Sequence, residues 1–206
     1  EYDANDRLTK TIDSVGGITT YTWDARGNLA SKSQGANTTT YSWRADNRLL
    51  SISNASVKIF YGYNPLGQRI KRYVIRGNIT TRTHYALDTQ RPYSEVLSES
   101  TQVGNGSWNH QHNTFTPDGL GELLQSGGQT VFADAQGHTR LVIDGAGNAT
   151  ALSYDAFGLE MGSAATAVNH RYTGEYFDQD SGLYHLRARD YDPSIGRFIS
   201  MDEHPG

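Results

Sequence analysis

The chain has 206 residues, a formal net charge of −4 and a pI near 6.0, so it lacks the excess positive charge that a nucleic-acid-binding surface needs. It contains no cysteine, which excludes a disulfide-stapled fold, and no apolar run long enough for a membrane helix. Only 36% of the residues are hydrophobic, while Gly (22) and Tyr (13) are abundant, a composition that favours thin β-layers over a thick core.

The first part of the chain repeats one short motif. An aromatic residue is followed by an acidic or polar residue, a turn with Gly or Asn, and an aliphatic residue, at residues 2–8, 23–29, 43–49 and 63–70; the leading aromatics are 21, 20 and 20 residues apart. Between the motifs, β-branched and aromatic residues alternate with polar ones, which is typical of strands. Asn, Asp and Gly tolerate positive φ, so the motif itself predicts a tight turn. We therefore predict a row of β-hairpins that bury their apolar faces only against their neighbours.

The repeat period is lost after residue 87. Residues 88–129 are rich in Ser, Asn, Gln and Gly, which indicates either a flexible linker or irregular strands with long loops; Trp108 and Phe115 favour the second. The motif then returns in a different form at residues 132–138 and 154–158. Because no segment shows an amphipathic helical pattern, the sequence predicts an all-β fold in three parts, 1–87, 88–129 and 130–206.

The end of the chain carries the most specific motif. Residues 192–202 read Asp-Pro-x-x-Gly-Arg-Phe-x-x-x-Asp. Together with the upstream repeats, this motif resembles the bacterial Rhs, or YD-repeat, proteins and their Rhs repeat-associated core, an architecture shared with Tc-toxin cocoon subunits and teneurins. The resemblance covers essentially the whole chain. It implies a β-hairpin ribbon that spirals into a hollow shell, with residues 130–206 as a C-terminal core plug that is truncated before its usual end.

The same resemblance implies a function. The chain would be a structural segment of an Rhs-type polymorphic toxin that encloses the C-terminal toxic or effector domain of the same protein. The implied partners are this cargo domain, other YD-repeat segments of the shell, components of a secretion system such as type VI, and an immunity protein. No nucleic acid, membrane span or cofactor is expected. The implied location is secreted or associated with the bacterial cell envelope.

Three carboxylates, Asp190, Asp192 and Asp202, lie within thirteen residues of the C-terminal part. Two carboxylates held close together can share a proton, as in an aspartyl protease that activates water. Nearby arginines, Arg189 and Arg197, are suited to hold one of them ionised. These five residues are the candidate catalytic set. The alternative is that the aspartates form turns and ion pairs in a structural plug.

The resemblance supports the catalytic hypothesis for the longer parent protein, in which the core cuts its own chain just downstream and releases the enclosed cargo. Asp192 and Asp202 match the family motif, with Arg189 and Asp190 as assisting residues. Position 203 is Glu where many relatives have Pro, which leaves the cleavage sequence open. The expected reaction is a single cut in the chain itself, without turnover of an external substrate.

A second possible function is a cell-surface adhesion or carbohydrate-binding module. Trp108 is the tryptophan outside the repeats and the candidate ligand-binding residue, because an exposed aromatic ring on a β-surface can stack on a sugar ring. Trp23 and Trp43 occupy equivalent repeat positions, which favours a packing role. His110 and His112 lie in a polar segment with no evident third ligand, so no metal site is predicted.

Overall fold

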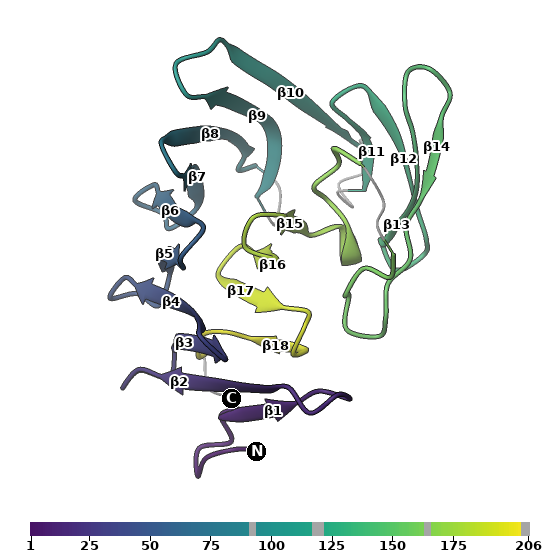
Figure 1. The fold of residues 1–206 in the computed structure, drawn as a ribbon. Helices are drawn as coiled ribbons and strands as arrows, with labels where there is room; N and C mark the ends of the chain where they lie inside the picture. Colours follow the sequence, from purple (N-terminus) through teal and green to yellow (C-terminus); the bar gives the residue numbers. More distant parts are fainter. Residues whose placement is uncertain (91–93, 117–121, 163–165, 203–206) are drawn as a thin grey trace.

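A computed structural model describes residues 1–90, 94–116, 122–162 and 166–202. The first fourteen strands form one antiparallel sheet in which every strand pairs with the next strand in the sequence. This sheet, here called the wall, bends into an arch, and a second sheet of four strands, the core sheet, lies inside the bend (Figure 1). The predicted all-β fold is confirmed, since the only helical element among the described residues is a three-residue 3₁₀ turn, Tyr172–Gly174.

The strands follow one another closely along the chain. The first half of the wall contains β1 (Lys10–Ile12), β2 (Ile18–Trp23), β3 (Leu29–Gln34), β4 (Asn37–Trp43), β5 (Leu49–Ser53), β6 (Lys58–Tyr63) and β7 (Arg69–Arg76). The second half contains β8 (Ile79–Asp88), β9 (Glu95–Val103), β10 (Trp108–Phe115), β11 (Leu123–Ser126), β12 (Gln129–Ala133), β13 (Thr139–Ile143) and β14 (Ala149–Ala151). The core sheet contains β15 (Tyr176–Asp178), β16 (Leu183–Leu186), β17 (Arg189–Asp192) and β18 (Arg197–Phe198).

In three of the four repeats the turn is held by the side chain of its acidic or amide residue, and the repeat at residues 43–49 has Arg44 at this position. Asp24 Oδ1 accepts hydrogen bonds at 2.9 Å from the backbone N–H groups of Arg26 and Asn28. The same pair of bonds is made in other turns by Asp3, Asp13, Asn64, Asp134, Asp144 and Asp155. The residue before the last donor has positive φ, as at Gly27 (+81°), which favours Gly or Asn there. The predicted hairpin turns are therefore confirmed.

The leading aromatic residue of a repeat ties it to the repeat before. Its indole N–H or phenol hydroxyl donates a hydrogen bond to the backbone carbonyl of the aliphatic residue in the preceding motif. These bonds run from Trp23 to Leu8, from Trp43 to Leu29 and from Tyr63 to Leu49, at 2.8, 2.7 and 2.7 Å. All three rings also pack on the buried apolar cluster of the wall, so the predicted packing role of the two tryptophans is confirmed.

Pairing continues through the segment in which the sequence period is lost. β8 pairs with β9 from Thr81 to Asp88, with one bulge near its end, and β9 pairs with β10 along five consecutive residues. Residues 88–129 thus contain the long strands β9 and β10 as well as β11. Of this segment, residues 91–93 and 117–121 lie outside the described residues.

The core sheet packs on the inner, concave face of the wall. Leu183 of β16 and Ile199, which follows β18, belong to the same buried cluster as Leu29, Leu49 and Ile59 of the wall. A second buried cluster, which includes Val131, Val142 and Val168, joins the far end of the wall to the segment leading into the core sheet. Two apolar contacts therefore hold the small sheet within the arch.

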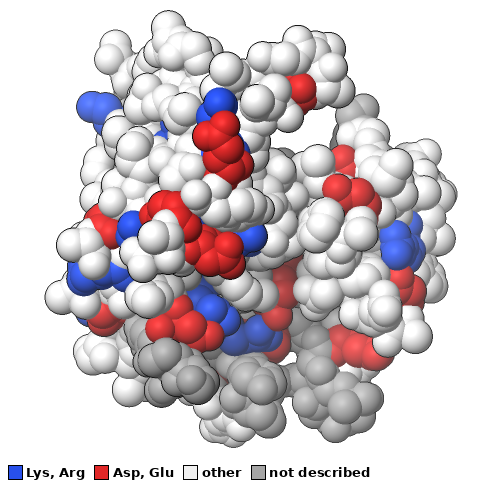
Figure 2. All heavy atoms as spheres, turned by 90° about the horizontal axis from the view of Figure 1, so that it is seen from below, with Lys and Arg blue, Asp and Glu red and all other residues white. Residues whose placement is uncertain are grey.

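The surface on the side of the two chain ends carries mixed charge. Acidic and basic side chains lie next to each other over the visible described part of this face (Figure 2). Among the described residues, no helix is long and apolar enough to cross a membrane.

Candidate functional site

The seam between the wall and the core sheet gathers about half of the buried polar side chains. On the wall, Tyr61, Arg72, Tyr85 and Glu99 come from four successive strands, β6 to β9, and all four are buried. Tyr61 lies directly opposite Arg72, and Tyr85 lies directly opposite Glu99. Residues directly opposite on antiparallel strands share a face of the sheet, so the pairing register places these groups on the inner face.

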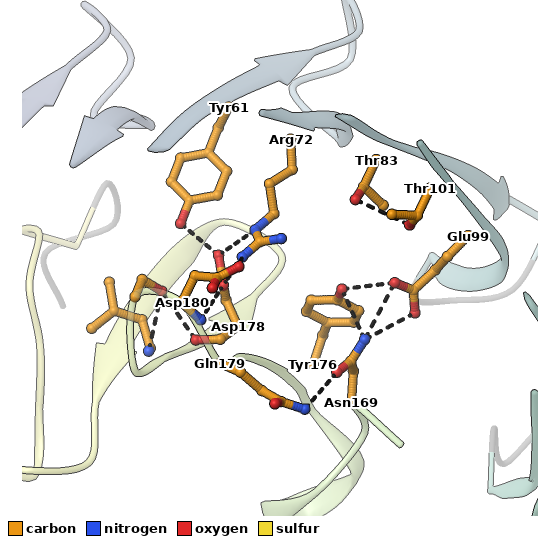
Figure 3. A network of polar contacts seen from close by, with 12 residues as sticks. Tyr61, Arg72, Thr83, Glu99, Thr101, Asn169, Tyr176, Asp178, Gln179 and Asp180 are labelled. Carbon is orange, nitrogen blue, oxygen red and sulfur yellow. Dashed lines mark hydrogen bonds and ion pairs between the residues drawn. The ribbon is translucent and has the colours of Figure 1, made fainter. Parts of the chain in front are cut away.

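Asp178, at the end of β15, is the centre of an ion-pair network (Figure 3). Arg72 donates from Nε to Oδ2 at 2.9 Å and from Nη2 to Oδ1 at 2.5 Å, and the Tyr61 hydroxyl donates to Oδ2 at 2.7 Å. Asp180 pairs with both Arg72 and Arg76. Burial disfavours the charged form of Asp180, but the two arginines outweigh this and lower its pKa. Such two-pronged arginine contacts are strong and directional, so they fix β15 on the wall.

Glu99 is held mainly by neutral donors in the same region (Figure 3). The Tyr176 hydroxyl donates to Glu99 Oε2 at 2.8 Å, and Asn169 Nδ2 lies 3.4 and 3.3 Å from the two carboxylate oxygens. The Tyr85 hydroxyl lies 3.2 Å from that of Tyr176. Burial raises the pKa of Glu99, and the hydrogen bonds from Tyr176 and Asn169 offset this only in part.

The predicted carboxylates lie in three different environments. Asp190 and Asp192 are two residues apart on β17 and both are only 4% exposed. Alternation along a strand therefore places them on the same face. The side chain of Asp202 is half exposed and pairs with Arg189 at 2.9 Å. Glu203 lies outside the described residues.

Asp190 forms a buried ion pair with the wall. Arg69 Nη2 of β7 lies 2.9 Å from both of its carboxylate oxygens, and His185 Nδ1 lies 3.2 Å from Oδ1. Burial alone would raise the pKa of Asp190, but the charge of Arg69 and then the contact with His185 outweigh it, so the pKa is lowered. Asp190 is therefore held as a carboxylate.

Asp192 shapes the turn that follows β17. Its Oδ1 accepts hydrogen bonds from the backbone N–H and the hydroxyl of Ser194, at 2.9 and 2.5 Å, and its Oδ2 lies 3.2 Å from Lys32 Nζ of β3. The two predicted arginines stack on aromatic rings. Arg189 lies 3.9 Å from the ring centroid of Phe198, and Arg197 lies 4.7 Å from that of Tyr2.

Sequence reasoning missed the cations that hold the two buried aspartates. Arg69 is 121 residues from Asp190, and Lys32 is 160 residues from Asp192. Their positions inside the repeats carry no local signal of this pairing, because it depends on which face of the wall meets the core sheet.

A third contact of the seam surrounds a small cavity. Arg187, which follows β16, pairs with Glu95 of β9 at 2.9 Å and with Glu175 at 2.6 Å. These three side chains line a cavity of about 170 Å³ together with His170. Burial, with a smaller effect from the Arg187 charge, lowers the pKa of His170 to about 4, so its imidazole is neutral near pH 7.

Trp108, the predicted ligand-binding residue, lies away from the seam. It begins β10, its side chain is 38% exposed, and its ring centroid is 5.0 Å from that of His84. His110 and His112 are exposed on the same strand, with His110 Nδ1 2.8 Å from the Ser100 hydroxyl. In the part of the chain that the structure describes, no three His, Cys, Asp or Glu side chains are grouped as for a metal ion.

Comparisons with known proteins agree with the repeat pattern. The family model described as RHS Repeat matches residues 2–40. The chain is 35% identical over 167 residues to salivary gland surface protein 1 of Aedes aegypti, covering 74% of this chain and 5% of that protein. It is 29% identical over 216 residues to the tRNA3(Ser)-specific nuclease WapA of Bacillus spizizenii, covering 100% of this chain and 8% of the nuclease. The chain thus spans only a small fraction of the length of these relatives.

The fold is similar to that of a solved toxin structure. The crystal structure of TcdB2-TccC3 without its hypervariable C-terminal region matches with a TM-score of 0.60 and 17% sequence identity, over 91% of this chain and 12% of that chain. At this level of identity the match concerns the fold. It agrees with the arrangement of a curved antiparallel wall with a small sheet in its bend.

Proposed function

The chain belongs to the Rhs, or YD-repeat, proteins, and from this premise we propose that it forms part of a hollow β-shell that encloses a C-terminal toxic or effector domain of the same protein. The observation that carries the proposal is the seam. A small sheet is locked into the concave side of a curved wall by buried ion pairs, with Asp178 bound by Arg72 and Asp190 bound by Arg69. In this proposal the core sheet is the plug of the shell.

The relatives support a cargo in a longer chain. WapA is a nuclease specific for a tRNA, and TcdB2-TccC3 has a hypervariable C-terminal region; both are several times longer than this chain. In this proposal the segment described here supplies wall and plug, and the toxic activity lies elsewhere in the parent protein. Neighbouring YD-repeat segments complete the shell. The protein is secreted or cell-envelope associated, its delivery uses a secretion system such as type VI, and an immunity protein neutralises the cargo.

Limited proteolysis of the full-length protein tests the enclosure. We expect the C-terminal cargo region to resist a protease at concentrations that digest the same region expressed alone. Asp178→Ala, which leaves Arg72 and Tyr61 without their shared partner, should expose the cargo region, whereas Lys58→Ala on the opposite face of the wall should not. Equal digestion of the enclosed and the separately expressed region would contradict the proposal.

We further propose that the core of the parent protein cuts its own chain after this segment, with Asp190, Asp192 and Asp202 as the participating carboxylates. Two aspartates on one face of β17 and a third in contact with Arg189 supply the residue types of an aspartyl mechanism. Arg69 holds Asp190 ionised, which suits it to accept a proton in such a mechanism. Arg189 and Arg197 have supporting roles.

The intact mass of the full-length protein tests this second proposal. We expect the wild type to appear as two fragments cut shortly after this segment and Asp202→Asn as one chain. Asp202 is suitable because its side chain is half exposed, so the variant should keep the wild-type melting temperature. Asp46→Asn, a part-exposed aspartate that also pairs with an arginine, is the matched control and should be cut normally. A single chain in the wild type would overturn the proposal.

A further inference from the structure

The cavity of about 170 Å³ beside Arg187, here called the seam cavity, has one side formed by the wall and the other by the core sheet with the segment before it. Among the described residues, the wall side carries three charged side chains, from the turn before β5, from β7 and from β9: Arg48, Arg69 and Glu95. The opposite side carries two histidines and two charged side chains: His170, His185, Glu175 and Arg187. Charges in this cavity therefore act between the two sheets.

Each guanidinium at the seam cavity lies beside a carboxylate, so the charges are balanced while the imidazoles are neutral. The ion pairs are Arg48–Asp46 at 3.5 Å, Arg69–Asp190 at 2.9 Å, Arg187–Glu95 at 2.9 Å and Arg187–Glu175 at 2.6 Å. Arg48 also donates from Nη1 to the backbone carbonyl of Arg187 at 3.3 Å, a direct bond between the wall and the segment after β16. A further positive charge in the cavity would meet guanidiniums that already occupy these carboxylates.

His170 is surrounded mainly by aromatic rings. It is 3% exposed, and its Nδ1 has no hydrogen-bond partner among the described residues. Its ring lies edge-on to Phe115 of the wall and to Tyr176 of the core sheet, with centroid distances of 5.9 and 5.7 Å. Burial disfavours the charged form of the imidazole, and the Arg187 guanidinium disfavours it further, so the pKa is lowered to about 4. A proton on His170 is therefore much more stable once the imidazole has left this site.

From this arrangement we propose that the seam cavity is an acid-sensitive switch: when His170 takes up a proton, the core sheet separates from the wall more often, while the wall keeps its own strand pairing. The new charge lies in a cavity that already holds three guanidiniums, and surroundings of low dielectric constant strengthen the repulsion. Separation brings water to the imidazole and moves these charges apart. The proposal rests on the proposed shell, in which such an opening gives the enclosed cargo a way out in an acidic medium.

The other titratable groups at the cavity act in both directions. Burial and then the charge of Arg69 lower the pKa of His185, although its contact with Asp190 opposes this, so His185 adds to the effect of His170. Burial raises the pKa of Glu175, so a proton taken up there favours the closed seam. His170 outweighs this opposing group, because a pKa of about 4 in the closed seam against 6.5 in water favours separation by at least about tenfold at pH 4.5.

Hydrogen exchange of the full-length protein at pH 7 and at pH 4.5 tests the proposal, with each rate divided by the intrinsic rate at that pH. On acidification, we expect the protection of the amides in β15 to β17 to fall at least tenfold more than that of the amides in β2 to β5. His170→Phe retains an aromatic ring and takes up no proton, so the two falls should then agree within threefold. His112→Phe, at an exposed histidine of β10, is the matched control and should behave as the wild type does.

Two results would overturn the proposal. An equal loss of protection in both sheets of the wild type would show that acid unfolds the whole molecule. A selective loss that persists in His170→Phe would show that another group is responsible. If His170→Phe does not fold at pH 7, His170→Gln replaces it, since glutamine does not take up a proton either.

A separate readout distinguishes the switch from the shell, because the exchange rates of the two sheets report on the seam whether or not a cargo is enclosed. Digestion with pepsin at pH 4.5 should cut the cargo region of the wild type at least tenfold faster than that of His170→Phe. Equal digestion of the two proteins, together with the expected exchange, would contradict the shell and leave the switch supported.

A cargo region that resists pepsin in the wild type, although the core sheet has lost its protection, would overturn the role of the switch in cargo release.

Discussion

The same strands form the inner and the outer face of the wall, but the inner face binds the core sheet and the outer face is turned away from it. On β7, Arg72 turns inward to bind Asp178, while its neighbours Lys71 and Tyr73 face outward. The inward Tyr61 and Arg72 are buried and bind Asp178, which is more than 100 residues away, whereas the outward side chains are exposed or partly exposed. Because the side-chain period of a strand is two, a shift of one residue would exchange the faces. The repeat ribbon can therefore carry a rigid seam and a free surface at once.

Breaking the Arg72–Asp178 pair on the inner face should give the largest change in the free energy of unfolding, and so the clearest difference between the inner and outer faces. Asp178→Ala leaves a buried guanidinium and the Tyr61 hydroxyl without their shared acceptor, and loss of one partner of a buried pair costs about 3–5 kcal/mol. Because Arg72 keeps its contact with Asp180, we expect a decrease in the free energy of unfolding of about 3 kcal/mol, measured by urea denaturation.

The outer face supplies the control for that experiment. Lys71→Ala should change the free energy of unfolding by no more than about 0.5 kcal/mol. If Asp178→Ala falls within the same range as Lys71→Ala, the seam does not stabilise the fold.

The pH dependence of stability offers a second distinction. The pKa of His170 is lowered from 6.5 to about 4 in the folded state. The contribution of the neutral, buried imidazole to the free energy of unfolding is therefore complete above pH 6.5, and it is lost as the pH falls toward 4. The maximum loss is on the order of 3 kcal/mol. His170→Phe retains the edge-on ring contacts with Phe115 and Tyr176 and should flatten this part of the stability curve.

His112→Phe is the matched control, because His112 is exposed on the outer face. Its stability curve between pH 4 and 6.5, followed by urea denaturation at each pH, should have the wild-type slope. A wild-type slope in His170→Phe as well would show that burial of this imidazole does not control the pH dependence.

The smallest of these effects concerns the bonds between successive repeats. Tyr63→Phe removes only the hydroxyl that donates to the Leu49 carbonyl at 2.7 Å and accepts from Arg69 at 3.1 Å. We expect a loss of about 1–2 kcal/mol, because two partly buried polar groups lose a partner. Tyr73→Phe on the outer face should be nearly neutral in the same thermal or urea unfolding experiment. Equal effects of the two substitutions would contradict the assigned role of the leading aromatic.

Sequence alone predicts the local parts of this fold well. The turn around Asp24 needs a side-chain acceptor at its start and a residue that tolerates positive φ at position 27. Asp24 and Gly27 meet both requirements within four residues of sequence. The aromatic and aliphatic positions recur at a fixed distance, so their packing between neighbouring repeats is predictable from the period. The Rhs resemblance rests on motifs of the same local kind, and the match of the RHS Repeat family model to residues 2–40 confirms it.

The seam is not predictable in this way. Asp190 is next to Arg189 in the sequence but binds Arg69, because the curvature of the wall and the placement of the core sheet decide which cation is near. β9 gives only a weak strand signal, since Ser98, Glu99 and Ser100 are polar on both faces. Its inward carboxylate is accommodated by Tyr176 and other donors from the core sheet and the segment before it, which the local pattern does not contain.

Native-state hydrogen exchange tests the central claim most directly, namely that the wall and the core sheet are one cooperative unit joined by the seam. The amides of β6 to β8 and those of β15 to β17 should open with the same free energy, and Asp178→Ala should lower both by the same amount. Core-sheet amides that exchange with a much smaller free energy than the wall, or a variant in which only β15 to β17 respond, would contradict the claim.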